Sequence, residues 1–155
     1  MKHVIASYIR QVWNKNDWLY EDQHGFRPGY SCKSQEITVY QDIADSLDNG
    51  DRIDAIIVDS SKAFHLALHG QLLMKIAKLG VDSRVAAWIR EFLSGCTQRV
   101  RVGGQLLEEV RVTSGVLQRS ILSPLLFLAN VNDIWKNTES TIRLFAEECE
   151  FIEKL

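Results

Sequence analysis

The segment Leu144-Phe145-Ala146-Glu147-Glu148-Cys149 places two adjacent carboxylates inside an apolar run, where an ordinary buried strand would not carry them. A buried charge is costly unless it is paired or binds a cation. A third carboxylate, Asp59, ends the β-branched run Ile56-Ile57-Val58. We therefore expect two strand ends that bring acidic groups to one metal site.

Length and composition describe an ordinary globular chain. Its 155 residues form one domain at most, or a piece of a larger one, and 46% are hydrophobic. The net charge of −2 lacks the basic excess of a self-sufficient nucleic-acid binder. Three widely spaced cysteines exclude a disulfide framework and the common zinc spacings. With no signal peptide and no run of roughly 20 apolar residues, we expect an intracellular protein, cytoplasmic or nuclear, that is not secreted and does not bind a membrane.

Hydrophobic periodicity predicts the secondary structure. It indicates helices over about residues 4–13, 37–47, 72–79, 83–92 and 123–131, the second with Ile37, Tyr40, Ile43, Ala44 and Leu47 on one side. Residues 53–59 are predicted to be a buried strand, and residues 142–152 a strand pair with the acids at or near its turn. Residues 98–112 are typical of a hairpin that turns at Gly103-Gly104. The mixture predicts an α+β fold with an antiparallel sheet packed on helices.

The three acids have the chemistry of phosphoryl transfer. Two-metal sites hold divalent ions about 3.5–4 Å apart, and magnesium prefers hard oxygen ligands in octahedral geometry. Asp59, Glu147 and Glu148 would supply such ligands if their strands lie side by side. The alternative is that the two Glu residues are solvated in a turn and Asp59 caps a strand end.

The segments around these acids occur in a fixed order: Gln23-His24-Gly25-Phe26-Arg27-Pro28-Gly29, then Asp59-Ser60-Ser61-Lys62-Ala63-Phe64-His65 (motif A), Ser114-Gly115-Val116-Leu117-Gln118-Arg119-Ser120 (motif B) and Phe145-Ala146-Glu147-Glu148 (motif C). Together they resemble the reverse transcriptase domain of non-LTR (LINE-like) retrotransposons, especially jockey-like elements, from about His3 to Leu155. The resemblance implies a partial right-hand polymerase, with a fingers remnant over about 1–50 and the palm over about 51–155.

The resemblance also implies the catalytic residues and the cofactor. Asp59, Glu147 and Glu148 match the catalytic acids. Asp59, Glu147 and the backbone carbonyl of Ser60 match the ligands of a two-metal Mg²⁺ site. The reaction implied is RNA-directed DNA synthesis, a nucleotidyl transfer that uses an RNA template and a DNA primer.

Three further residues match positions that contact substrate or nucleic acid. Phe64 matches the aromatic gate beneath the incoming sugar, and Gln118 matches the amide that helps to place template and nucleotide. Arg27 lies in the loop on the fingers side and is expected to contact the template backbone. The ordinary alternatives are a core aromatic, a surface amide and a solvated loop charge. His65 and His69 stand four residues apart, but they lack the third ligand motif of a metal site.

The chain departs from the family in all three motifs. Motif A typically reads Asp-Phe-Ser-Lys-Ala-Phe-Asp, where this chain has Ser60 and His65. Motif B typically reads Ser-Gly-Val-Pro-Gln-Gly-Ser, where it has Leu117 and Arg119, and both acids of Phe-Ala-Asp-Asp are Glu. The extra methylene of Glu displaces each carboxylate, and a displacement of about 1 Å can cost on the order of 10²-fold in rate. Arginine hinders the torsions and the close ligand approach that glycine permits.

We therefore expect a truncated copy with degenerate motifs that is inactive as it stands. The chain begins after the family's basic fingers strands and ends directly after motif C, so template and primer binding is expected to be weak or absent. Two alternatives are a non-catalytic binding module derived from the palm, and a translated relic with no selected role. Salt-dependent RNA binding would favour the first, and molten behaviour would favour the second.

Overall fold

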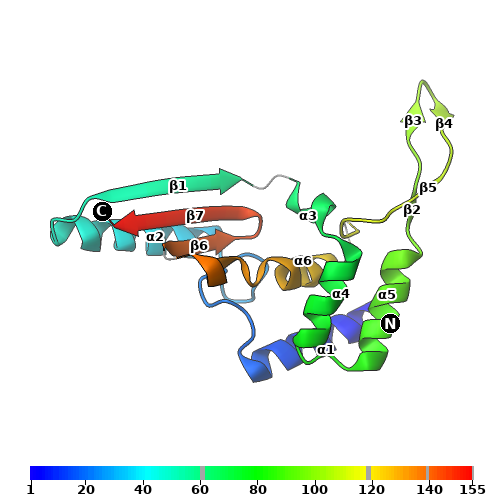
Figure 1. Ribbon diagram of the computed structural model, residues 1–155, viewed down its shortest axis with the longest axis horizontal. Helices are drawn as coiled ribbons and strands as arrows, with labels where there is room; N and C mark the ends of the chain where they lie inside the picture. The colour runs from blue at the N-terminus through cyan, green and yellow to red at the C-terminus, as the bar shows by residue number, and fades with distance from the viewer. Residues whose placement is uncertain (60–61, 118–119, 139, 155) are drawn as a thin grey trace. The chain divides into compact units, whose positions relative to one another are not determined.

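The computed structural model describes residues 1–155 except 60–61, 118–119, 139 and 155. The elements in chain order (Figure 1) are α1 (Lys2–Asn16), α2 (Cys32–Asp48), β1 (Ile53–Asp59), α3 (Ala63–Leu66), α4 (His69–Lys78), α5 (Ser83–Ser94), β2 (Thr97–Gln98), β3 (Arg101–Val102), β4 (Gln105–Leu106), β5 (Val110–Arg111), α6 (Ser123–Val131), the 3₁₀ helix η1 (Ile134–Asn137), β6 (Thr141–Phe145) and β7 (Glu148–Lys154). Helices and antiparallel sheets together confirm the α+β class.

The chain forms two units, and each is built from two separate stretches of sequence. Unit 1 contains Met1–Trp18 and Phe64–Asn130, and unit 2 contains Leu19–Ala63 and Val131–Leu155. The motif A acid and motif C therefore belong to unit 2, whereas Phe64 and motif B belong to unit 1. The assignment of residues 1–50 to the fingers and 51–155 to the palm stays a prediction.

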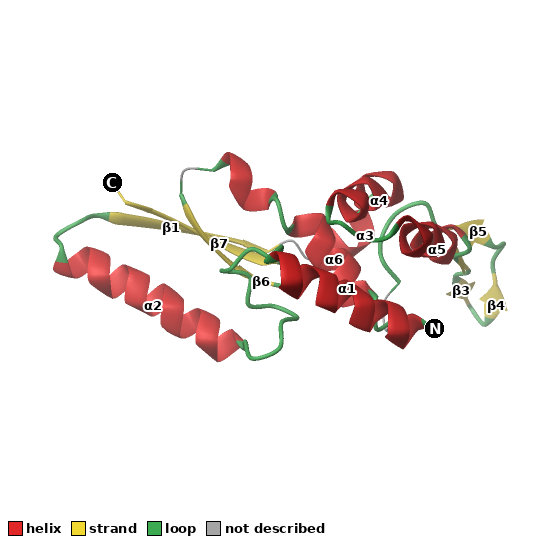
Figure 2. Cartoon of the chain, turned by 90° about the horizontal axis from the view of Figure 1, so that it is seen from below, coloured by secondary structure: helices red, strands yellow, loops and turns green. Residues whose placement is uncertain are grey.

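Unit 2 is a three-stranded antiparallel sheet with one long helix. The strand order is β1-β7-β6, and the β6–β7 hairpin pairs Phe145 with Glu148. Figure 2 shows α2 running along the sheet. Two contacts attach this helix to the sheet. Gln35 Nε2 donates to Glu150 Oε2 over 3.3 Å, and Arg143 Nε donates to Asp42 Oδ2 over 2.7 Å.

The opposite face of this sheet is apolar. Opposed residues of an antiparallel pair point to the same face, so Leu144 and its partner Cys149 lie on the face away from α2. They form a buried cluster with Ile142, against which Tyr20 and Phe151 pack. The β6–β7 hairpin thus has one buried face formed by Ile142, Leu144 and Cys149, and α2 contacts its other face through Arg143 and Glu150.

The prediction that residues 53–59 form a buried strand is wrong. β1 is a strand, but Ile56 is 60% exposed and Ile57 is 73% exposed. Within the described residues β1 pairs only with β7, so its other edge has no strand partner. An apolar run predicts burial only if something covers it, and neither face of β1 is well covered.

The helix predicted over residues 37–47 is present as α2, but its apolar side is not its buried side. Ser31 and Ser34 form a reciprocal capping box that begins the helix. The fully buried residues of α2 are Gln35 and Ser46. The apolar side chains Ile37, Tyr40 and Leu47 are each more than 60% exposed.

Unit 1 is a helical unit that carries a long β-hairpin. Its helices α1, α4, α5 and α6 bury a hydrophobic core that includes Ile9, Trp13, Leu72, Ile76, Ile89, Leu93, Leu126 and Leu128. Asp82 caps α5, because its Oδ1 accepts the Arg84 N–H over 2.9 Å. No helix in the described part of the chain has the length and apolarity needed to cross a membrane.

The hairpin predicted over residues 98–112 is present but interrupted. Its turn is Gly103-Gly104, with positive φ at both residues as a type I′ turn requires. From the Thr97–Arg111 pair to the Arg101–Leu106 pair, one strand advances four residues and the other five. The extra residue makes a β-bulge, which explains why the ladder splits into β2–β5 and β3–β4.

Candidate active site

The two acidic strand ends meet in unit 2. Asp59 is the last residue of β1 and Glu148 is the first residue of β7, and they are direct partners in the antiparallel register. Opposed residues share a face, with their Cβ atoms about 4.5–5.5 Å apart. The expectation that these two strands lie side by side is therefore confirmed, across 89 positions of sequence.

Glu147 lies in the turn that precedes Glu148. Because Phe145 pairs with Glu148, Ala146 and Glu147 form a two-residue turn. Ala146 has φ of 55°, a left-handed conformation in which glycine is usual. The surrounding structure must therefore hold the turn in this conformation.

The side chain of Gln23 holds the turn at Ala146. Gln23 Oε1 accepts the Ala146 N–H over 3.0 Å, and Gln23 Nε2 donates to the Ala146 carbonyl over 3.4 Å. The same Oε1 accepts the Gly25 N–H over 2.7 Å, and Gln23 is only 2% exposed. One buried amide thus pairs with both backbone groups of Ala146. The sequence does not predict this function of Gln23, since no periodic signal marks a buried amide.

Gly25 allows this loop to approach the turn. A Cβ built at Gly25 would lie 2.1 Å from the Ala146 backbone nitrogen and 2.7 Å from its Cα. Such distances are far inside van der Waals contact with backbone atoms, so any side chain would push the loop and the turn apart. The glycine of the Gln-His-Gly segment is therefore required by the packing of the acidic turn.

His24 joins the same loop to β6. Its backbone N–H donates to the Leu144 carbonyl over 2.8 Å, and its Nδ1 lies 3.0 Å from Ser34 Oγ. The ring is 7% exposed and lies against Tyr30, with 4.6 Å between ring centroids. Burial lowers the pKa of His24 from its ordinary value, which favours the neutral ring at this position.

Arg27, expected to contact the template backbone, is engaged within its own loop. Its Nη1 donates to the carbonyls of Tyr20, Glu21 and Gln23 over 2.8, 3.1 and 3.3 Å. Its guanidinium lies 4.6 Å from the centroid of the Tyr30 ring. These contacts give Arg27 a structural function in folding the loop, and a contact with template stays a prediction.

Arg143 joins three parts of unit 2. It makes two hydrogen bonds to Asp42 of α2 and an ion pair with Asp22 of the loop. Nearby, Tyr20 donates to the Ile142 carbonyl over 3.1 Å, and burial raises the pKa of Tyr20 to about 12. The Arg143 guanidinium lies on the same face of the sheet as Glu150. Its positive charge is paired with the two aspartates and not with that glutamate.

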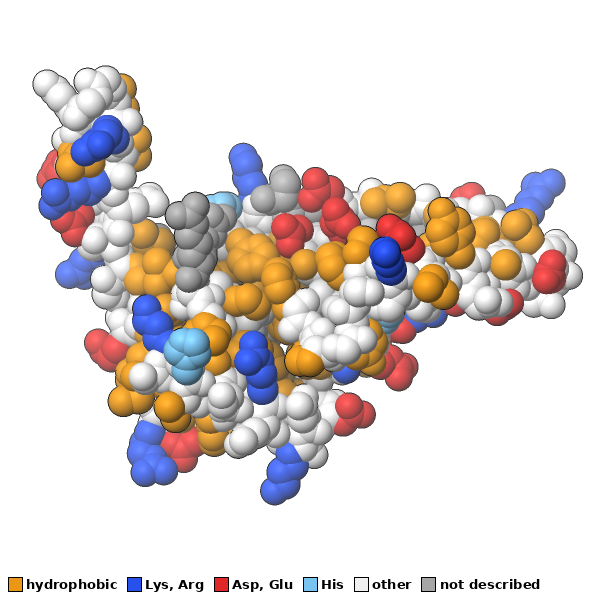
Figure 3. Space-filling view, turned by 180° about the vertical axis from the view of Figure 1, so that it is seen from behind, with side chains coloured by type: hydrophobic (Ala, Val, Ile, Leu, Met, Phe, Trp, Pro, Cys, Tyr) orange, Lys and Arg blue, Asp and Glu red, His pale blue; other side chains and the backbone are white. Residues whose placement is uncertain are grey.

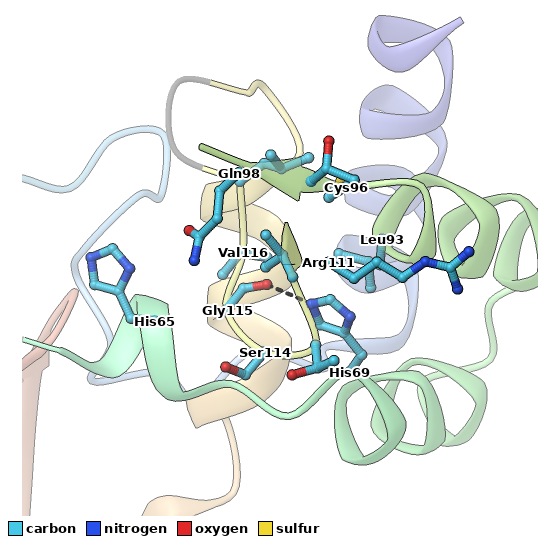
Figure 4. Close-up of a pocket in the computed structure, with 13 residues that line it drawn as sticks. His65, His69, Leu93, Cys96, Gln98, Arg111, Ser114, Gly115 and Val116 are labelled. Atoms are coloured by element: carbon cyan, nitrogen blue, oxygen red, sulfur yellow. Dashed lines mark hydrogen bonds between the residues drawn. The ribbon is translucent and has the colours of Figure 1, made fainter. Parts of the chain in front are cut away.

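Within unit 1, the motif B loop is attached to the end of motif A and to the residues that follow it. The Val116 N–H donates to the Phe64 carbonyl and the Gly115 N–H to the Ala67 carbonyl, both over 2.8 Å. Figure 4 shows His69, whose Nε2 lies 2.8 Å from the Gly115 carbonyl. Because that carbonyl accepts, Nε2 carries the proton. His69 therefore supports the loop, a function that the sequence analysis did not identify.

Gly115 explains the glycine of motif B. Its φ is +86°, and a Cβ there would lie 3.0 Å from three backbone atoms of Phe64 and His65. The loop lines a cavity of about 410 Å³ that includes His65, His69, Gln98, Arg111 and Ser114. In Figure 4 the rings of His65 and His69 lie apart from each other.

Phe64, the predicted sugar gate, packs inside unit 1. Its ring stacks on Phe127 with 4.1 Å between centroids and 8° between planes, and Phe127 is fully buried. Phe64 itself is half-buried, so the ring also has a solvent-accessible part. Ser60, Gln118 and Arg119 lie outside the described residues, and their predicted functions stay predictions.

The described carboxylates meet only part of what a two-metal site needs. Asp59 and Glu148 provide hard oxygen donors on one face. However, no three His, Cys, Asp or Glu side chains in the described ranges are grouped closely enough to hold a metal ion. The residues as they lie do not complete the Mg²⁺ site that the family generally uses.

The carboxylates lie at the ends of two adjacent antiparallel strands, and one of these strands follows a two-residue turn that contains a further acid. This arrangement is typical of the palm of a nucleic-acid polymerase. The chain matches the model of the family "Reverse transcriptase (RNA-dependent DNA polymerase)" over residues 1–152, and it belongs to that family.

Two relatives are proteins of transposable elements. The probable RNA-directed DNA polymerase from transposon X-element of Drosophila melanogaster is 29% identical over 133 residues, which are 86% of this chain and 14% of the relative. The retrovirus-related Pol polyprotein from the type-1 retrotransposable element R2 of Popillia japonica is 30% identical over 89 residues, or 57% of this chain and 12% of the relative. The chain thus spans a small part of either relative.

Proposed function

We propose that this chain is a palm domain derived from an RNA-directed DNA polymerase. It retains the arrangement of the catalytic acids, but it does not perform nucleotidyl transfer as it stands. Asp59, Glu147 and Glu148 are the residues that correspond to the catalytic acids, and Ser60 supplies a carbonyl ligand. The observation that carries the proposal is the direct pairing of Asp59 with Glu148 beside the turn that contains Glu147.

The chemistry of the acids supports the lack of activity. Magnesium requires near-ideal octahedral geometry, and each Glu carries its carboxylate one methylene further from the backbone than Asp would. The backbone of the turn cannot move back to offset the extra methylene, because the Gln23 side chain is hydrogen-bonded to both the N–H and the carbonyl of Ala146. The longer side chains therefore displace the ligand oxygens, and no third ligand among the described residues joins the pair.

Phe64 and Gln118 are proposed as the contacts to the incoming nucleotide, and Arg27 as a contact to the template. The ligands proposed are an RNA template and a DNA primer. With a net charge of −2, the chain offers little electrostatic attraction to a phosphate backbone, so the expected binding is weak.

Primer extension tests the proposal. The purified chain, an RNA template and a labelled DNA primer are incubated with Mg²⁺ or Mn²⁺, beside the Asp59→Ala variant. The expected result is no extension above that of Asp59→Ala. Incorporation by the unmodified chain that Asp59→Ala abolishes would contradict the proposal.

A second arm identifies the cause of inactivity. The triple variant Glu147→Asp, Glu148→Asp and Arg119→Gly restores the family's residues. Extension by this variant, lost again on adding Asp59→Ala, would assign the defect to the substitutions. Failure of the triple variant would assign it to those parts of the relatives that this chain does not span.

A further inference from the structure

Two hairpins in the described part of the chain have two-residue turns, and they use different residues at the turn. The hairpin of unit 1 turns at Gly103-Gly104, where glycine adopts positive φ at no steric cost. The β6–β7 hairpin turns at Ala146 and Glu147, with positive φ at Ala146 and not at Glu147. Positive φ at the first central residue alone is the pattern of a type II′ turn, in which that residue is usually glycine. Alanine at this position therefore needs support from outside the hairpin.

Gln23 can give this support because its own backbone is fixed against β6. The Leu144 N–H donates to the Asp22 carbonyl over 3.0 Å, and the His24 N–H donates to the Leu144 carbonyl over 2.8 Å. This stretch of the loop thus pairs in parallel with β6, with Gln23 opposite Leu144. From that fixed base the Gln23 side chain extends to the turn, where it makes its hydrogen bonds.

An amide is the side-chain group that fits both backbone groups of Ala146. Its carbonyl oxygen has two lone pairs, and it accepts the N–H groups of Ala146 and Gly25 over 3.0 and 2.7 Å. Its NH₂ group donates to the Ala146 carbonyl over 3.4 Å. A carboxylate would lack the donor, and methionine, of similar length, would lack both groups. Because Ala146 is only 8% exposed, its backbone groups would then have little solvent to replace the amide.

The acids lie at the surface, so their positions depend on the backbone that carries them. Figure 3 shows acidic side chains close together where β1 ends and the β6–β7 hairpin turns, and Asp59 and Glu148 are exposed. Glu147 directly follows Ala146, and Glu148 begins the strand that pairs with β1. A change in the Ala146 backbone angles would therefore change the direction of Glu147 and disturb the pair that Glu148 makes with Phe145.

We propose that Gln23 is a positioning residue for the acidic turn. Its side-chain amide selects the left-handed conformation of Ala146, and through that residue it sets the positions of Glu147 and Glu148 beside Asp59. Gln23 acts through the backbone of the turn and not as a ligand. These positions matter for metal binding only under the proposed function, whereas the effect of Gln23 on the turn does not depend on it.

Hydrogen exchange followed by NMR tests the effect on the turn without any metal. The variant Gln23→Met keeps the length of the side chain and removes the amide. The Ala146 amide is expected to exchange roughly 10- to 100-fold faster than in the unmodified chain, because its acceptor is lost. The Leu144 amide, which donates to the Asp22 carbonyl, should keep its protection and so show that the loop is still in place.

Gln35→Met is the matched control. Gln35 is a second buried glutamine of unit 2, 4% exposed against 2% for Gln23, and its amide donates to Glu150. This variant should leave the exchange of the Ala146 amide unchanged. Equal protection of the Ala146 amide in Gln23→Met and in the unmodified chain would overturn the proposal. Equal loss in Gln35→Met, or joint loss at Ala146 and Leu144 in Gln23→Met, would also overturn it, since either would show a general loosening of unit 2.

Mn²⁺ binding tests the consequence for the acids. In the background Glu147→Asp and Glu148→Asp, Gln23→Met is expected to weaken Mn²⁺ binding about tenfold, through lost support of the ligands. Adding Ala146→Gly should restore much of the affinity, because glycine adopts positive φ without help. Gln35→Met should leave the affinity unchanged. Such a rescue distinguishes positioning from general destabilisation, since glycine would not restore a lost core contact. A weakened Gln23→Met variant that Ala146→Gly does not rescue would overturn the proposal.

The two measurements also separate Gln23 from the proposed cause of inactivity. If the background with two Asp residues binds Mn²⁺ no more tightly than the unmodified chain, the proposed displacement of the carboxylates is wrong. The exchange of the Ala146 amide then still decides whether Gln23 holds the turn. If the background binds tightly and Gln23→Met changes neither the Mn²⁺ affinity nor the exchange, the positioning function of Gln23 is wrong and the proposed displacement stands.

Discussion

The two strands that bring the acids together are supported very differently. The β6–β7 hairpin has buried residues on one face, α2 on the other and the Gln23 amide at its turn. β1 has β7 along one edge and exposed aliphatic side chains on both faces. The position of Asp59 depends on one ladder of backbone hydrogen bonds, so we expect Asp59 to be held less rigidly than Glu148. Conditions that loosen β1 should separate the acids before the hairpin unfolds.

The strongest test of this difference is a pair of truncations of the same residue type. Ile142→Ala removes a fully buried side chain of β6 and is expected to lower the free energy of unfolding by roughly 2–5 kcal/mol, through lost transfer energy and a cavity. Ile57→Ala, on exposed β1, is expected to change it by less than about 0.5 kcal/mol. Urea denaturation followed by circular dichroism measures both. Similar losses for the two variants would contradict the difference in packing between the β6–β7 hairpin and β1.

The loop that supports the hairpin turn gives the next largest effect. Gly25→Ala forces a methyl group into the Ala146 backbone, and the expected loss of stability is about 3 kcal/mol, the upper end of ordinary overpacking. Gly70→Ala is the matched control, because nothing lies within 4 Å of a Cβ at that position in α4. Alanine there should stabilise the helix slightly. Equal melting temperatures for the two variants would show that the loop does not contact the turn as described.

A smaller effect concerns pH. Burial lowers the pKa of His24, so below about pH 6.5 the unfolded chain takes up a proton that the folded chain resists. The free energy of unfolding therefore falls as the pH falls from this value. His24→Gln should flatten this part of the pH profile, measured by thermal melts. A pH profile with the same slope in His24→Gln as in the unmodified chain would contradict the assignment.

The sequence allowed the meeting of the two acidic strand ends to be predicted because its signal is local. A carboxylate at the end of a β-branched run, and two in a turn between apolar residues, have few explanations. The exposure of β1 could not be predicted in the same way, since the hydrophobicity of residues 53–59 does not indicate whether anything covers them. The apolar side of α2 was misleading for the same reason. The support of the turn was also hidden, because the function of Gln23 and Gly25 depends on Ala146, more than 120 residues away.

The proposed displacement of the Asp59, Glu147 and Glu148 carboxylates from metal-binding geometry is tested by Mn²⁺ binding, measured by electron paramagnetic resonance. The unmodified chain is expected to bind Mn²⁺ weakly. The double variant Glu147→Asp and Glu148→Asp should bind it about tenfold more tightly, and adding Asp59→Asn should remove that gain. Tight binding by the unmodified chain that Asp59→Asn abolishes would contradict the account.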